Sequence, residues 1–225
     1  MPKSLQSRKR QLVRDAIFDA AIDLFAEKGF DETTVEEVSQ AAGISRRSFF
    51  RYFESKDDLL AYSIVNCGVA LNKKVAECGK GLSPLEVMRK ATEAVAGQME
   101  ASPHMRQMVE ISKRSKAARQ ANLSRLAEAQ DSLSEAYARQ FRITSKEDFK
   151  TRLIANLTFQ VMVESSVSWA KGENESISTA AKQALTYYTH LFCDQSATSP
   201  ASESTAKPRK APTSIGQRKS TAAKR

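Results

Sequence analysis

The segment from residue 33 to residue 56 constrains the fold most, because it reads as two short helices joined by a turn at Gly43. Thr34 is a favourable N-cap for a first helix over residues 35–42. Gly43 stands where many helices end in a left-handed residue, which costs glycine no Cβ clash. Ser45 can cap a second helix directly afterwards. The pattern predicts a helix-turn-helix.

The two predicted helices divide their residues between a small apolar core and a basic surface. We expect five side chains to share that core: Val38, Ala41, Ala42, Phe49 and Phe53. Arg46, Arg47 and Ser48 fall in the first turn of the second helix, where the core does not need them. A helix with a basic N-terminal turn is suited to the major groove of DNA.

Residues 43–56, GISRRSFFRYFESK, resemble the recognition segment of the TetR (tetracycline-repressor-like) transcriptional regulators. The preceding FAEKGF at 25–30 and TTV at 33–35 also match that family. The resemblance covers roughly the first sixty residues, and beyond them only the helical architecture carries over. It implies an all-α fold, with a three-helix DNA-binding domain followed by an α-helical ligand-binding and dimerisation domain.

The resemblance also implies roles for single residues. Thr34 and Lys56 would contact phosphates, and Arg46, Arg47 and Ser48 would contact base edges. Phe50 departs from the family, which usually has tyrosine there, so it can offer only an apolar contact such as one to a thymine methyl group. The DNA-binding residues expected on this basis are Thr34, Ser45, Arg46, Arg47, Ser48, Phe50, Arg51, Tyr52 and Lys56.

Positive charge is concentrated at the two ends of the chain. The formal net charge is +9, of which residues 1–14 contribute +5 and residues 195–225 contribute +6, leaving −2 for the middle. Basic ends would add salt-sensitive affinity for phosphates without sequence information. The tail is rich in Ser, Thr, Ala, Pro, Lys and Arg, so we expect it to be disordered, acting either as an electrostatic arm or as an inert extension.

Several classes of protein find no support in the sequence. There is no glycine-rich phosphate loop, no HExxH and no GxSxG, so an enzyme is not expected. His104 and His190 lie in different predicted helices without a carboxylate at ligand spacing, so neither a metal site nor a cofactor is expected. No apolar run approaches the ~20 residues of a membrane helix, and the first residues lack a secretion signal, so a cytoplasmic protein is expected.

The three cysteines, Cys67, Cys78 and Cys193, form no CxxC pair. Cys67 and Cys78 share a helix face but would lie about 16 Å apart along one helix, too far for a disulfide. Packed, reduced thiols are the favoured interpretation, and a redox sensor is the alternative.

The remaining sequence predicts a series of helices without strand alternation. The expected helices cover residues 8–28, 56–78, 84–101, a Met-rich segment around 105–111, a long segment around 123–141, 145–171 and 177–192. We expect three parts: a DNA-binding domain at 1–55 with a basic N-terminal arm, an effector-binding and dimerisation domain at 56–193, and a basic tail at 194–225.

By analogy with the family, the last two helices would form a homodimer, and the dimer would read a palindromic operator in double-stranded DNA. Half-sites would lie about 34–36 Å apart or at multiples of that spacing. An effector would tilt the long connecting helix and release the DNA, so a repressor is expected. The alternatives are an activator of the same family and a scaffold protein that retains the helix-turn-helix.

The effector itself is a small molecule that the sequence does not identify. Met, Phe, Tyr and Trp side chains often line adaptable apolar pockets, although they fill cores at least as often. The expected ligand-binding residues are Met99, Met105, Met108, Tyr137, Phe159, Met162 and Trp169.

Overall fold

The computed structural model describes residues 5–144 and 148–193, and within these ranges it contains only helices and their connections. The nine described helices are α1 (Leu5–Lys28), α2 (Val35–Ala41), α3 (Arg46–Phe49), α4 (Lys56–Glu77), α5 (Pro84–Glu100), α6 (Met105–Arg114), α7 (Lys116–Phe141), α8 (Asp148–Ala170) and α9 (Ile177–Cys193). The all-α prediction is confirmed. The expected start of the helix over 145–171, at residues 145–147, and the tail at 194–225 lie outside the described residues.

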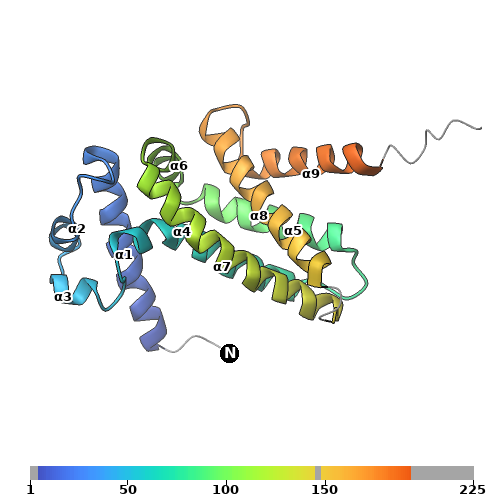
Figure 1. The fold of residues 1–225 in the computed structure, drawn as a ribbon, viewed down its shortest axis with the longest axis horizontal. Coiled ribbons are helices and arrows are strands. Elements are labelled where there is room, and N and C mark those ends of the chain that lie inside the picture. The colour runs from blue at the N-terminus through green and yellow to red at the C-terminus, as the bar shows by residue number, and fades with distance from the viewer. Residues whose placement is uncertain (1–4, 145–147, 194–225) are drawn as a thin grey trace, which may run out of the picture.

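The first three helices form a small head at one end of an elongated molecule (Figure 1). Its core is built from aromatic side chains that touch one another. The rings of Phe25 and Phe30 lie 5.0 Å apart, and those of Phe49 and Phe53 lie 5.9 Å apart. Val38 is fully buried among them. Edge and tilted ring contacts of this kind stabilise a core beyond simple burial of area.

Two details of the predicted head core are wrong. Ala41 is exposed, because it lies on the outer side of α2. The predicted core also lacks Ile22 and Phe25 of α1, which are almost completely buried in it. Helix α1 begins at Leu5, three residues earlier than predicted.

The remaining helices form a body in which α4 and α7 run alongside each other (Figure 1). Helix α4 begins at the head and continues through the body, so it belongs to both parts. A second core lies deep in the body and includes Leu71, Leu133, Tyr137 and Phe159. Helices α8 and α9 pack on each other and on α5.

Candidate functional site

The reading segment of the head is held in place by side-chain caps at both of its short helices. Thr34 and Glu37 form a reciprocal capping box on α2, with the Thr34 side chain accepting from the Glu37 amide at 3.2 Å. Gly43 adopts φ +65° in the turn, a conformation that other residues rarely take. Ser45 caps α3 by accepting from the Ser48 amide at 3.1 Å. These local contacts fix the direction in which α3 leaves the turn.

Five side chains form a basic and aromatic surface on and after α3, and all of them except Tyr52 are exposed. Arg46 and Arg47 are exposed and form no ion pair with any described residue. Phe50 is 47% exposed, and the Arg46 guanidinium lies over its ring at 5.8 Å. Arg51 lies over the Tyr52 ring at 5.1 Å and donates to its hydroxyl at 3.3 Å. Unpaired guanidinium groups on an outer helix face are free to bind bases or phosphates.

Lys56 has a different environment from the one that the resemblance implies. Its ammonium donates to three backbone carbonyls, those of Phe30 at 2.6 Å, Asp31 at 3.2 Å and Thr33 at 2.9 Å. It also lies 4.4 Å from the centre of the Phe30 ring. An ammonium has three donors. All of them are used inside the head, so Lys56 anchors the connection between α1 and α2 to the start of α4.

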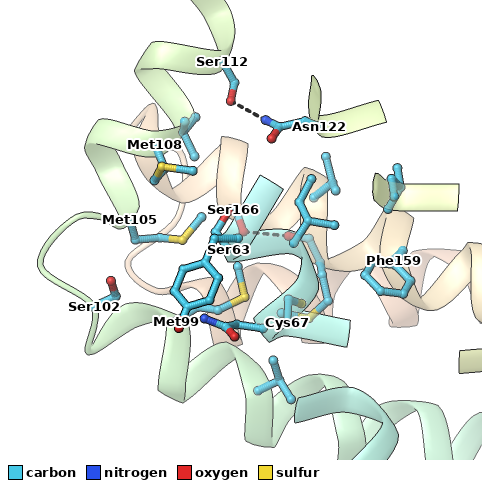
Figure 2. A pocket seen from close by; sticks show the side chains of 18 of the residues that line it. Ser63, Cys67, Met99, Ser102, Met105, Met108, Ser112, Asn122, Phe159 and Ser166 are labelled. Carbon is cyan, nitrogen blue, oxygen red and sulfur yellow. Dashed lines mark hydrogen bonds between the residues drawn. The ribbon is translucent and has the colours of Figure 1, made fainter. Parts of the chain in front are cut away.

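The body contains a cavity of about 810 Å³ whose wall is mostly apolar. Helices α4, α5, α6, α7 and α8 surround it, and residues of α1 reach one end. In Figure 2, Met105 extends toward Ser63 and Ser166, while Asn122 donates to the Ser112 hydroxyl at 2.8 Å along the upper edge. A cavity of this size is in the range that holds a drug-sized molecule.

Five of the seven predicted ligand residues line this cavity: Met99, Met105, Met108, Phe159 and Met162. Tyr137 and Trp169 do not. Tyr137 is fully buried in the body core, where it stacks on Phe141 at 6.1 Å and its hydroxyl lies 3.1 Å from the Thr158 hydroxyl. Trp169 lies under the guanidinium of Arg106, 4.0 Å from the ring centre. Both are packing residues here, so their assignment to the ligand site is corrected.

Comparison with known proteins identifies the class of this chain. Residues 17–62 match the model of bacterial regulatory proteins of the tetR family. The HTH-type transcriptional regulator TcmR of Streptomyces glaucescens is 28% identical over 202 residues, which cover 84% of this chain and 89% of TcmR. Residues 17–62 therefore form a tetR-family DNA-binding domain. TcmR, which matches most of the chain, is a transcriptional regulator.

Two other matches differ in how much of the chain they cover: one is confined to about a quarter of it, and the other extends over most of it. The negative regulator IcaR of the biofilm operon icaADBC in Staphylococcus epidermidis is 36% identical over 55 residues, which cover 24% of this chain and 30% of IcaR. The structure of Thermus thermophilus FadR with lauroyl-CoA covers 90% of this chain and 100% of FadR, with a TM-score of 0.51 at 22% identity. The second likeness shows a shared fold and nothing about the ligand.

The SmeT–triclosan complex shares the fold as well, with a TM-score of 0.54 at 19% identity over 80% of this chain and 91% of SmeT.

No helix among the residues described for this regulator is both long and apolar enough to cross a bilayer.

One contact of the regulator was missed because its partners are far apart in the sequence. His104 occupies the N-cap position of α6 without a capping side-chain hydrogen bond, and its ring lies against two carboxylates of α1, at 3.3 Å from Asp19 and 3.7 Å from Asp23. The sequence analysis found no carboxylate near His104 because it considered only neighbours along the chain. The described residues contain no cluster suited to a metal ion. The contact between His104 and the two α1 carboxylates joins the head to α6.

Tyr62 is a second residue that only the structure identifies. It is 3% exposed and lines the cavity, yet its hydroxyl donates to Asp15 of α1 at 2.8 Å. Its ring lies 5.5 Å from Phe53 in the head core and 5.3 Å from Phe18 of α1. Burial raises the pKa of Tyr62, so the phenol stays protonated and can donate. Tyr62 therefore belongs to the cavity wall and to the head core at once.

Two of the three cysteines, Cys67 and Cys78, resemble packing residues, whereas the side chain of Cys193 is not described. Cys67 and Cys78 carry free thiols and pack against the body core. Burial raises the pKa of Cys67 to about 12. A thiol of that kind is a poor nucleophile, because only the thiolate reacts. The redox-sensor alternative therefore loses support at Cys67.

Proposed function

We propose that this regulator binds a palindromic operator as a homodimer, represses transcription there, and is released when a small molecule enters the cavity. The observation that carries the proposal is the shared position of Tyr62, which packs on Phe53 in the head core and also lines the cavity of the body. A sensor that controls DNA binding needs such a connection between two distinct sites.

Contact with DNA would come from the second helix of the head and the residues after it. Arg46 and Arg47 suit the acceptor edge of guanine, with Ser48 beside them, and Phe50 is exposed enough to meet a thymine methyl group. Thr34, Ser45, Arg51 and Tyr52 would hold the head against the backbone. Lys56 would not contact a phosphate directly, because the donors of its ammonium are used within the head.

Dimerisation would use α8 and α9. Three large side chains of these helices are more than half exposed, namely Phe149 at 68%, Leu153 at 56% and Tyr187 at 65%. A second copy would remove this apolar surface from water, which favours association. A two-fold dimer would then present two reading surfaces to two half-sites.

Release requires that the ligand prefer the arrangement of the protein that does not fit DNA. Equal affinity for both arrangements would shift nothing, however tight the binding. Ligand contacts on Tyr62 and on α6 would act on α1 through the Asp15 and His104 contacts, and on the reading segment through Phe53.

The test is binding of the purified protein to the DNA beside its own gene, compared with random duplex at moderate ionic strength. We expect a preference for the specific duplex that disappears when Arg46 and Arg47 are both changed to alanine. Arg139→Ala is the matched control, because Arg139 is exposed on α7 and pairs only with Glu135 there. Unchanged binding by the double variant would reject the proposal and favour the scaffold alternative. Light scattering should give a dimeric mass without DNA.

A further inference from the structure

The chemical character of the cavity differs between its two ends. The middle is apolar, with four methionines, Phe159 and several aliphatic side chains, and its polar groups there are neutral. At the α1 end, two carboxylates line it, Asp15 and Asp19. Where α6 meets α7, two cationic side chains line it, Lys113 and Arg119. The charge that remains unbalanced at each end determines which ligands the cavity favours.

The cations at the α6–α7 end are already engaged. The Lys113 ammonium pairs with the Glu110 carboxylate at 2.7 Å. The Arg119 guanidinium donates to the carbonyl of Lys113 at 2.7 Å and to that of Ser112 at 3.4 Å, which stabilises the end of α6. An anionic ligand would have to compete with these partners. The charge of Lys113 is therefore paired, whereas Arg119 keeps its charge but has N–H donors engaged by two carbonyls.

The carboxylates at the α1 end lack such compensation. Asp15 accepts hydrogen bonds from Tyr62 at 2.8 Å and Gln11 at 2.9 Å, and both donors are neutral. Asp19 lies against His104, which also faces Asp23. Among the ion pairs of the described residues, no lysine or arginine contacts any of these three carboxylates.

Burial and crowding of like charge at this end both act on the pKa of Asp19. Burial raises the pKa of Asp19, the carboxylates of Asp15 and Asp23 raise it further, and His104 opposes them. Arg14 is near but is held over the Tyr62 ring at 4.8 Å and the Phe53 ring at 5.0 Å. A cation placed beside Asp15 and Asp19 would relieve this repulsion.

Two aromatic rings stand next to the carboxylates in the cavity wall. Phe18 and Tyr62 lie 5.3 Å apart with their planes at 57°. Aromatic faces attract organic cations, and they do so more strongly where water is excluded. The α1 end thus combines negative charge with π surfaces, while the methionine-lined middle accepts an apolar body of variable shape.

We propose that the cavity selects lipophilic organic cations, with an apolar body among the methionines and a protonated or quaternary nitrogen beside Asp15 and Asp19. This inference rests on the proposed function, in which the cavity is the effector site, and it adds the charge of the effector. It also excludes acyl thioesters of coenzyme A as preferred ligands, because their phosphates would meet an acidic end or an occupied basic one.

Three acridines of nearly equal shape test the charge preference with the full chain at pH 7.5 and without DNA. The probes are 9-aminoacridine, which is a cation at this pH, acridine, which is neutral, and acridine-9-carboxylate, which is an anion. Fluorescence titration should show 9-aminoacridine binding about tenfold or more tightly than acridine, with the carboxylate weakest. The advantage of the cation should shrink as salt is raised, because screening weakens exposed charge pairs.

Matched variants locate the effect in the cavity. Asp15→Asn and Asp19→Asn keep the side-chain shape and should each remove most of the preference for 9-aminoacridine over acridine. Asp23→Asn is the control, because Asp23 lies on the same helix and contacts His104 but does not line the cavity. It should leave the preference unchanged. An equal loss in all three variants would overturn the proposal, because long-range charge would then explain the selectivity.

The outcomes also separate this inference from the proposed function. If acridine binds as tightly as 9-aminoacridine, or the carboxylate binds tightest, the cation proposal is wrong while the cavity remains a ligand site. If none of the three probes binds at up to millimolar concentration, both the cation proposal and the assignment of the cavity as effector site are rejected.

Discussion

The head and the body of this regulator are both helical, but they use their interiors differently. The head core is a continuous set of touching aromatic rings, with Phe25, Phe49 and Phe53 almost completely buried. The body is larger and contains a cavity of about 810 Å³ lined by methionines. Close packing allows one arrangement, whereas a cavity with flexible walls allows several. In the proposed function, recognition of DNA would therefore use a fixed surface and sensing an adaptable one.

The largest expected contrast concerns stability. Phe49→Ala should lower the free energy of unfolding by about 3–5 kcal/mol, because Phe49 is fully buried and the head cannot collapse around the space. Met105→Ala should cost less than about 2 kcal/mol, because Met105 is half-buried and already borders the cavity. Urea unfolding followed by circular dichroism at equal protein concentration measures both. Equal losses would show that the two interiors are packed alike.

Lys56 sharpens the comparison, because it lies where the two parts meet. Lys56→Met should lower the free energy of unfolding by about 1–3 kcal/mol, because three carbonyls of the head would lose a charged donor. Lys90→Met is the control, since Lys90 is exposed on α5. Thermal unfolding checks the difference. An unchanged melting temperature, together with a smaller salt dependence of DNA binding, would instead assign Lys56 to a phosphate.

The smallest effect concerns the cap of α2 and depends on pH. The Glu37 carboxylate contacts the Lys28 ammonium and accepts a hydrogen bond from the Thr34 amide. These contacts lower the pKa of Glu37 to about 2 from the ordinary 4.5. A lowered pKa in the folded state stabilises the protein above pH 4.5, and this contribution is lost as the pH falls toward 2.

Glu37→Gln should therefore be less stable than the parent at pH 6–7, and the two should converge near pH 2. Glu36→Gln is the control, because Glu36 is exposed in the same first turn of α2. Melting temperatures across this range provide the measurement. A constant difference between Glu37→Gln and the parent at all pH values would mean that the charge of Glu37 contributes nothing.

The head could be predicted from sequence because its determinants are local. Thr34, Gly43 and Ser45 act within three or four residues of their own positions, and the structure has each of them as a cap or turn. The prediction failed at Ala41 because helical spacing alone does not say how far a core extends around a short helix. It failed to identify the role of Lys56 because the three carbonyls that it binds come from a connection more than twenty residues away.

The body could be predicted as helices but not as a site. Periodicity identifies which residues are apolar on a helix, yet it does not distinguish a filled core from a cavity wall. Tyr137 and Phe159 look alike in the sequence, and only Phe159 borders the cavity. The contacts of Asp19 with His104, and of Asp15 with Tyr62, join residues 47 or more positions apart. Such pairs depend on how helices are arranged, which a single sequence does not specify.

A close approach of α4 to α7 has a mechanical consequence. A Cβ atom on Gly68 would lie 3.2 Å from the Cβ of Ala129 on α7 and 3.4 Å from the Phe159 ring on α8, so there is little space between the helices there. Gly68 is twelve residues beyond the start of α4, or about 18 Å along its axis. With this point as a fulcrum, a rotation of roughly 5° would displace the start of α4 by about 1.6 Å. Under the proposed function, α4 would act as a lever that converts a slight change in the width of the cavity into a misfit of atomic size at the DNA groove.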